Sequence, residues 1–176
     1  DFERKPKVSV VEYMHMIELK TSVLLAGATT IGALLGGASE EDCRKLRRFA
    51  IELGLAFQLQ DDLLDTYADS DEFGKPVGGD ILEGKKTFLL TNALARADEP
   101  ARRSLLELLS DRTIVPAEKI ARVRAIYDRL GIRELTEKAV AAYFVDANLA
   151  LDALEVAPDR LKPLRELTAE LQGRRK

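Results

Sequence analysis

The sequence predicts an all-α protein, and three observations support that prediction. Aromatic residues make up only 6% of the 176 residues and Trp is absent, whereas the helix formers Ala, Leu, Glu and Arg are abundant. Apolar residues recur at helical spacing along most of the chain. Long stretches such as 42–66 contain no Pro and a single Gly, so nothing in them ends a helix.

The first helix is predicted to begin at Val10, because Ser9 and Glu12 have the spacing of a capping box. It runs to the pair of glycines at 36–37, which ends it. Residues 23–38 are all apolar, small or Thr, but this stretch is shorter than the roughly 20 apolar residues that cross a membrane. We therefore expect no transmembrane segment.

Two polar residues on this first helix have alternative interpretations. Lys20 is the last charged residue before Glu40. It is either a solvent-facing lysine whose stem covers apolar neighbours, or a cation with a function. His15 stands alone on a partly polar turn, and we interpret it as structural.

A central helix follows, capped by Ser39 with acidic residues in its first turn, where the helix dipole favours them. It continues to about Thr66, and its one glycine, Gly54, is tolerable in a helix interior. The flanks of this helix are almost entirely apolar, which is typical of a helix inside a protein. Its spacing predicts four core residues: Phe49, Leu53, Phe57 and Leu64.

The C-terminal end of this helix carries three acids within five residues. On a helix, Gln58, Asp61 and Asp65 share one stripe, and Asp62 lies beside it. Carboxylates about 6 Å apart repel by roughly 3 kcal/mol per pair at an effective dielectric near 20. Either this is a solvated acidic helix end, or a cation offsets the repulsion. With no His or Cys nearby, the second reading favours a hard cation such as Mg²⁺, which shares its site with substrate phosphates.

Residues 66–86 form the only long stretch without helical periodicity, and they are predicted to be a loop. The stretch contains four glycines together with Lys75, Lys85 and Lys86. Glycine-rich backbone beside lysines can surround a phosphate group, although a surface linker with solubilising lysines has the same composition. Because the loop directly follows the acidic cluster, metal and lysines together would suit a diphosphate.

Beyond Thr87 the sequence predicts only helices, with no domain linker and no internal repeat. Pro116 suits the first position of a helix, Gly131 suits a helix end, and Pro158 closes the helix before it. The predicted helices span 88–97, 100–109, 116–130, 132–156 and 161–171.

Composition limits the classes of partner and compartment. A net charge of −3 provides no basic surface for nucleic acid. The single Cys43 rules out an internal disulfide and suits a reducing cytoplasm. The chain starts at Asp1 without an initiator Met, so we expect it to be a piece of a longer protein.

Four motifs in this order resemble the trans-polyprenyl diphosphate synthases, the family that includes farnesyl and geranylgeranyl synthases. Each motif alone has weak or moderate specificity, whereas the four together at these spacings are specific. They are Lys20-Thr21, the run Phe57-Gln58-Leu59-Gln60-Asp61-Asp62-Leu63-Leu64-Asp65, the run Gly74-Lys75-Pro76-Val77-Gly78-Gly79-Asp80, and Glu83-Gly84-Lys85-Lys86-Thr87.

The resemblance implies a helical bundle of the isoprenoid synthase type and a transferase of isoprenoid biosynthesis. Such an enzyme condenses isopentenyl diphosphate with an allylic diphosphate, with Mg²⁺ as cofactor, and it is a homodimer. The resemblance implies the following roles: Asp61, Asp62 and Asp65 as Mg²⁺ ligands; Lys20, Lys75 and Lys85 as contacts of the allylic diphosphate; Thr21 and Gln58 as residues that line the reaction centre and steady the cation; and Lys20, Thr21, Gln58 and Asp61 as the catalytic group.

The resemblance covers residues 1–176 but only the C-terminal half of the family's length. The family's first aspartate-rich motif and its isopentenyl diphosphate site are absent from the 176 residues. We therefore expect the C-terminal part of a single all-helical domain, inactive without the other half. Two alternatives remain, a non-catalytic helical partner subunit of a prenyl synthase and a lyase similar to terpene cyclases. The retained acids argue against the first, and the lysine-glycine loop fits chain elongation better than the second.

Overall fold

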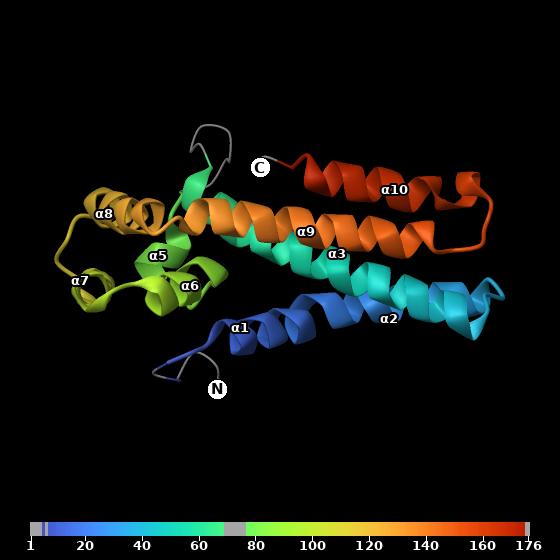
Figure 1. Ribbon diagram of the computed structural model, residues 1–176, viewed down its shortest axis with the longest axis horizontal. Coiled ribbons are helices and arrows are strands. Elements are labelled where there is room, and N and C mark those ends of the chain that lie inside the picture. Colours follow the sequence, from blue (N-terminus) through green and yellow to red (C-terminus); the bar gives the residue numbers. More distant parts are fainter. Residues whose placement is uncertain (1–4, 6, 69–76, 175–176) are drawn as a thin grey trace. The chain divides into compact units, whose positions relative to one another are not determined.

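The computed structural model describes residue 5 and residues 7–68 and 77–174, and it is helical, with no strand among them. The all-α prediction is confirmed. In chain order the elements are α1 (Val10–Ile17), the π-helix η1 (Glu18–Ser22), α2 (Val23–Leu35), α3 (Glu40–Tyr67), α5 (Gly79–Glu83), α6 (Phe88–Arg96), α7 (Glu99–Ser110), α8 (Pro116–Arg129), α9 (Ile132–Asp152) and α10 (Pro158–Gln172) (Figure 1).

Contacts within the chain form two compact units. The first unit contains the chain up to Met14 and residues 60–138, and the second contains residues 15–59 and 139–174. Helices α3 and α9 contribute residues to both units, so this division does not decide the prediction of a single domain.

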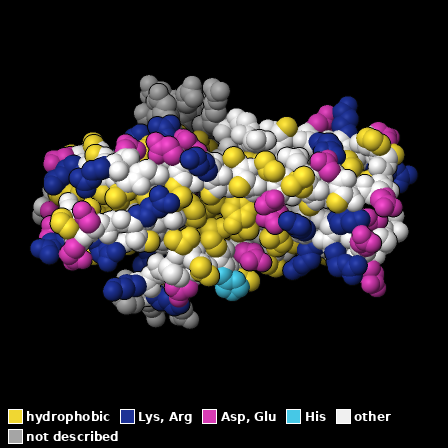
Figure 2. Space-filling model, viewed as in Figure 1, with side chains coloured by type: hydrophobic (Ala, Val, Ile, Leu, Met, Phe, Trp, Pro, Cys, Tyr) yellow, Lys and Arg dark blue, Asp and Glu magenta, His cyan; other side chains and the backbone are white. Residues whose placement is uncertain are grey.

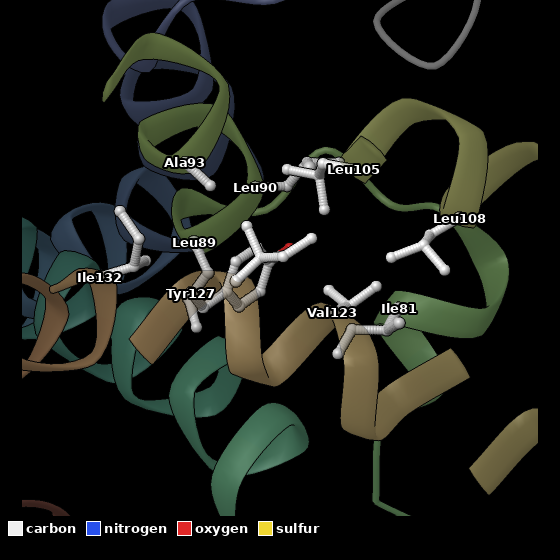
Figure 3. Packing of buried hydrophobic residues seen from close by; sticks show 10 residues of the cluster. Ile81, Leu89, Leu90, Ala93, Leu105, Leu108, Val123, Tyr127 and Ile132 are labelled. Carbon is white, nitrogen blue, oxygen red and sulfur yellow. The ribbon is translucent and has the colours of Figure 1, made fainter. Parts of the chain in front are cut away.

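The core of the first unit is built from helices α5 to α8 and the start of α9. Figure 3 shows their buried side chains pointing toward one another, with Leu89, Leu105 and Val123 wholly inaccessible to solvent. Each such side chain stabilises the fold by about 1.5–3 kcal/mol relative to an exposed position. Ile81 belongs to this cluster, so the core fixes the short helix α5 in place.

The second unit buries apolar residues of α2, α3, α9 and α10. Of the four predicted core residues, Phe49 and Leu53 are buried here as expected. Phe57 is only half-buried, and the Arg174 guanidinium lies 5.2 Å from the centre of its ring. Leu64, which belongs to the first unit, is also half-buried. The remaining buried apolar residues of this unit include Ile17, Ala26, Leu59, Phe144, Ala147, Leu151 and Leu161.

Local capping explains several of the helix boundaries. The Glu12 amide donates to Ser9 Oγ at 3.2 Å, and Glu12 Oε2 accepts the Ser9 amide at 2.9 Å, which is the predicted capping box. Ser39 Oγ accepts the Asp42 amide at 3.1 Å, as expected for a helix cap. Thr87 caps α6 in the same way through the Leu90 amide.

Three boundaries differ from the prediction. The stretch 66–86 contains α5, which is flanked by Gly78 and Gly84 in the left-handed region, at φ 89° and 68°. Five residues between two glycines are too few to show helical periodicity. Helix α9 ends at Asp152 rather than near residue 156, and Pro158 opens α10 because proline suits a first helical turn.

The stretch Val10–Leu35 is the one part of the described helices long and apolar enough, by length and composition, to cross a membrane. Core helices of soluble proteins pass the same test when they are mostly buried, but only 22% of the most apolar window of this stretch is buried. The prediction of no transmembrane segment therefore stays a prediction. Exposed apolar side chains on this stretch include Leu24 and Leu35, and Figure 2 shows apolar side chains at the surface together with the exposed His15.

Candidate functional site

The predicted acidic cluster lies at the C-terminal end of α3, within the first unit. Asp61 and Asp65 are half-buried, whereas Asp62 is only 5% exposed. The difference follows from helix geometry, because residues four apart share one face and the residue beside them turns away from it. The three carboxylates therefore do not have equivalent surroundings.

Asp62 is held inside the unit by two donors. Its Oδ2 accepts the hydroxyl of Tyr13 on α1 and, at 3.1 Å, the backbone amide of Phe88 on α6. The Tyr13 ring lies 6.3 Å from the Phe88 ring, centroid to centroid. Burial, followed by the charge of Asp62, raises the pKa of the Tyr13 hydroxyl, so the hydroxyl remains a donor at neutral pH. Asp62 thus connects α1 and α6 to α3.

Asp65 faces the start of α5. Its Oδ2 accepts the Asp80 amide at 2.9 Å, and its backbone carbonyl accepts the Gly78 amide at 2.6 Å. Partial burial raises the pKa of the Asp65 carboxyl, and the negative charges of Asp80 and Asp61 raise it further. The hydrogen bond from the Asp80 amide and the positive charge of Lys85 lower this pKa but do not cancel the rise. A nearby cation would relieve this destabilisation of the carboxylate.

Lys85 lies beside the same acids. Its Nζ is 2.8 Å from Asp80 Oδ1 and 3.1 Å from Glu83 Oε2, and about half of its side chain is exposed. The hydrogen bond to Asp80, more than any other contact, raises the pKa of Lys85, so the ammonium stays charged. The structure therefore brings Asp65, Asp80 and Lys85 together, and the partly exposed ammonium of Lys85 lies among carboxylates.

The end of α3 offers Mg²⁺ two half-buried carboxylates, those of Asp61 and Asp65. Among the described residues, no group of three or more His, Cys, Asp and Glu side chains could hold a metal ion. Mg²⁺ commonly takes one or two carboxylates and completes its shell with water and substrate phosphates. Asp61 and Asp65, both half-buried, fit that requirement, whereas Asp62 Oδ2 already accepts two hydrogen bonds. The metal role of all three stays a prediction.

Three other predicted site residues lie in the second unit. Lys20 and Thr21 belong to η1, where the Val23 amide bonds to the Glu18 carbonyl five residues earlier. Lys20 is exposed, and Thr21 Oγ1 donates to Gln58 Oε1 at 3.2 Å. Short π-helices occur frequently at functional sites. Lys75 lies outside the described residues.

Sequence reasoning did not find Tyr13, although Tyr13 contacts a predicted site residue. Tyr13 and Asp62 are 49 residues apart, and nothing in the pattern around either one links them. Asp80 was recognisable only from its place in the loop, after Gly78 and Gly79. The amide of Phe88 carries no side-chain signal at all.

The chain is similar in sequence to known proteins along most of its length. Residues 1–130 match the family model described as Polyprenyl synthetase. Over 168 residues the chain is 39% identical to the short chain isoprenyl diphosphate synthase of Methanothermobacter thermautotrophicus. This match covers 96% of the chain and 48% of that synthase. Over 160 residues the chain is 35% identical to the geranylgeranyl diphosphate synthase of Methanosarcina mazei, covering 91% and 47% respectively.

A solved structure resembles the chain along its whole length. The crystal structure of a geranylgeranyl pyrophosphate synthase matches it with a TM-score of 0.89 and 36% identity. That match covers 100% of this chain and 55% of the other. The chain thus spans about half the length of the curated relatives that it matches.

Proposed function

The chain belongs to the polyprenyl synthetase family, and we propose that it carries one part of the active site of a prenyl diphosphate synthase. In the proposed reaction, the bond between the allylic carbon and the diphosphate oxygen breaks. The double bond of isopentenyl diphosphate then attacks the allylic cation, and a proton leaves. The products are a longer prenyl diphosphate and inorganic diphosphate.

The observation that carries this proposal is the grouping of Asp61, Asp65, Asp80 and Lys85 around the junction of α3 and α5. Breaking the carbon–oxygen bond concentrates negative charge on the leaving oxygens, so positive groups aimed at them lower the barrier. Mg²⁺ held by Asp61 and Asp65 would supply most of that charge. Lys85 would add a charge-assisted hydrogen bond to a diphosphate oxygen once it turns from Asp80.

Within the second unit, Thr21 and Gln58 are candidates for stabilising the carbon centre of the proposed reaction. The cation left after ionisation is stabilised by nearby oxygen dipoles. Thr21 Oγ1 and Gln58 Oε1, which hydrogen-bond to each other, are oxygens of that kind. Lys20, which directly precedes Thr21 in the chain and is exposed, is a candidate contact for the allylic diphosphate.

We further propose that the activity requires a part of the protein that these 176 residues do not contain. The support is the half-length coverage of the relatives, since the chain spans 48% and 47% of two of the synthases that it matches. Residues 1–176 alone should then show negligible condensation of isopentenyl and allylic diphosphates in the presence of Mg²⁺. Product formation by the purified 176-residue chain would overturn this part of the proposal.

We also propose that the full-length protein is a homodimer and that it is cytoplasmic. Helix α2 exposes Leu24, Ile31, Leu34 and Leu35, which are between 60% and 86% accessible. Apolar residues exposed close together mark protein–protein contacts. Light scattering of the purified full-length protein measures its oligomeric state, and a monomeric mass at micromolar concentration would contradict the proposed homodimer.

The decisive experiment compares Asp61→Ala with Asp159→Ala in the full-length protein. Asp159 is an exposed acid in the first turn of α10, and removing it changes the same charge elsewhere. Asp61→Ala should lower turnover by orders of magnitude at saturating Mg²⁺, and Asp159→Ala should keep it. Equal turnover of the two variants would reject the role of Asp61. No turnover by the unaltered protein with any allylic diphosphate would reject the proposed function itself.

A further inference from the structure

The helical stretch from Val10 to Leu35 is locally widened at η1. A π-turn places one extra residue in the helix, which shifts the side chains that follow it. Here the widened turn contains Lys20 and Thr21, and its last residue, Ser22, is fully buried. The position of both candidate substrate residues therefore depends on what holds this turn against its neighbour.

Gly54 on α3 lies against Ser22 so closely that any side chain at position 54 would force one of the two helices to shift. A Cβ atom at Gly54 would lie 2.5 Å from Ser22 Oγ, 2.8 Å from Ser22 Cα and 2.9 Å from Ser22 Cβ. Ordinary contacts of a Cβ begin near 3.4 Å. Because one of the three atoms is backbone, a change of side-chain rotamer cannot relieve the contact.

Ser22 makes this contact through its small size rather than through its hydroxyl. Ser22 Oγ is buried and has no hydrogen-bond partner within the described part of the chain. A glycine in a helix interior weakens the helix relative to alanine, so Gly54 needs a packing reason. The close approach of the Ser22 backbone is that reason.

A second contact lies one helical turn further along α3. Gln58 is four residues from Gly54 and so shares its face, and Gln58 Oε1 accepts the Thr21 hydroxyl at 3.2 Å. Adjacent residues of η1 thus rest on adjacent turns of α3. Together the two contacts determine the separation of η1 from α3 at Thr21.

We propose that Gly54 is a positioning residue for the reaction, and this inference rests on the proposed function. Its missing side chain lets the Ser22 backbone lie directly on α3, which keeps Thr21 within hydrogen-bonding distance of Gln58 and sets the place of Lys20. An alanine at position 54 would push the Ser22 Cα outward by about 0.6 Å to reach an ordinary contact. Displacements approaching 1 Å at a reacting centre can lower rates by about 100-fold.

The test is a double-mutant cycle in the full-length protein with Gly54→Ala and Thr21→Val, measured as kcat for the condensation. Gly54→Ala should lower kcat by about tenfold to 100-fold. If it acts by moving Thr21 away from Gln58, Thr21→Val should cost little more in the Gly54→Ala background. A variant that merely weakens the fold would leave the two effects multiplicative, and that result would overturn the inference.

Gly32→Ala is the matched control, because it adds the same methyl group to a helix and meets no atom within 4 Å. Its effect should multiply with that of Thr21→Val, so any deviation from multiplicative behaviour is specific to position 54. If Gly54→Ala does not fold, the double variant Gly54→Ala/Ser22→Gly takes its place in the cycle. That pair removes the Oγ and Cβ contacts and leaves only the one to Cα.

A crystal structure of the Gly54→Ala variant provides a result independent of activity. We expect the Thr21 Oγ1 to Gln58 Oε1 distance to lengthen beyond 3.5 Å from its native 3.2 Å, which breaks the hydrogen bond. An unchanged distance would overturn the inference even if kcat fell. A lengthened distance in a protein that has no prenyl transfer activity would uphold the packing claim and reject the proposed function.

Discussion

The buried pair Tyr13 and Asp62 yields a quantitative prediction for Tyr13→Phe. The substitution removes one hydroxyl and leaves the ring, so its packing against Phe88 is retained. Asp62 is 5% exposed and Tyr13 is 3% exposed, so water cannot replace the lost donor. A hydrogen bond to a charged group contributes about 1.5–3 kcal/mol, and we expect the free energy of unfolding to fall by that amount.

Tyr67→Phe is the matched control because it also removes a tyrosine hydroxyl that donates to an aspartate. The Tyr67 hydroxyl is 2.6 Å from Asp128 Oδ1, but Asp128 is exposed, so water can replace the donor. We expect a cost of about 0.5–1 kcal/mol for this variant. The difference between the two substitutions isolates the burial of the acceptor.

Urea unfolding followed by far-UV circular dichroism provides both values, from the midpoint and the slope m. Asp62→Ala provides a third point, because Tyr13→Phe should cost almost nothing once its acceptor is gone. Equal costs for Tyr13→Phe and Tyr67→Phe, or an undiminished cost of Tyr13→Phe in the Asp62→Ala background, would refute the reasoning.

Three further predictions concern the loop, the first helix and the end of α7. Lys75→Ala in the full-length protein should raise the KM for the allylic diphosphate in steady-state kinetics, since a charge-assisted phosphate contact is lost, whereas unaltered kinetics would show that Lys75 faces water. Hydrogen bonds from Lys5 and then Ser9 lower the pKa of Glu12 from 4.5 to about 2, so its stabilisation of the α1 start is present above pH 4.5 and is lost as the pH falls toward 2. Amide protection factors at the start of α1, which are corrected for the intrinsic pH dependence of exchange, should therefore fall over that window in the native protein and stay constant in Glu12→Gln. Identical protection profiles for the two proteins would contradict the assignment. Lys119 is 4% exposed, and its Nζ donates to the carbonyls of Leu109 and Asp111 at 2.9 and 3.1 Å. Lys119→Met should therefore lower the free energy of unfolding by about 2–3 kcal/mol. Lys138 is exposed, and if Lys119→Met cost no more than the control Lys138→Met, that result would be inconsistent with this capping role.

Features that depend on neighbouring residues could be predicted from the sequence. The capping box at Ser9 and Glu12 involves groups three residues apart, and both hydrogen bonds are present. The proline at 116 and the glycine at 131 bound α8 within two residues, because their backbone preferences are intrinsic. The order of the four motifs was likewise enough to indicate the family, which the match over residues 1–130 confirms.

The exceptions have a common cause. Periodicity requires several turns to become visible, so the five-residue α5 could not be recognised within its glycine-rich surroundings. The π-turn at Glu18–Ser22 has no local sequence signal, because its packing partner, Gly54, lies more than thirty residues further along the chain. Gly54 itself is only a tolerated helix glycine until Ser22 lies against it.

The sequence by itself determined the all-α class, the longer helices, the acidic and basic motifs and the family to which the chain belongs, since these follow from the spacing, capping and type of residues that are close together in the chain. Only the tertiary structure decided which acids of the cluster remain accessible. Asp62 accepts hydrogen bonds from Tyr13 and Phe88, whereas Asp61 and Asp65 stay half-buried. That choice depends on which residues from distant parts of the chain pack against each face of α3, and pairings of this kind are set by the complete core rather than by any local pattern.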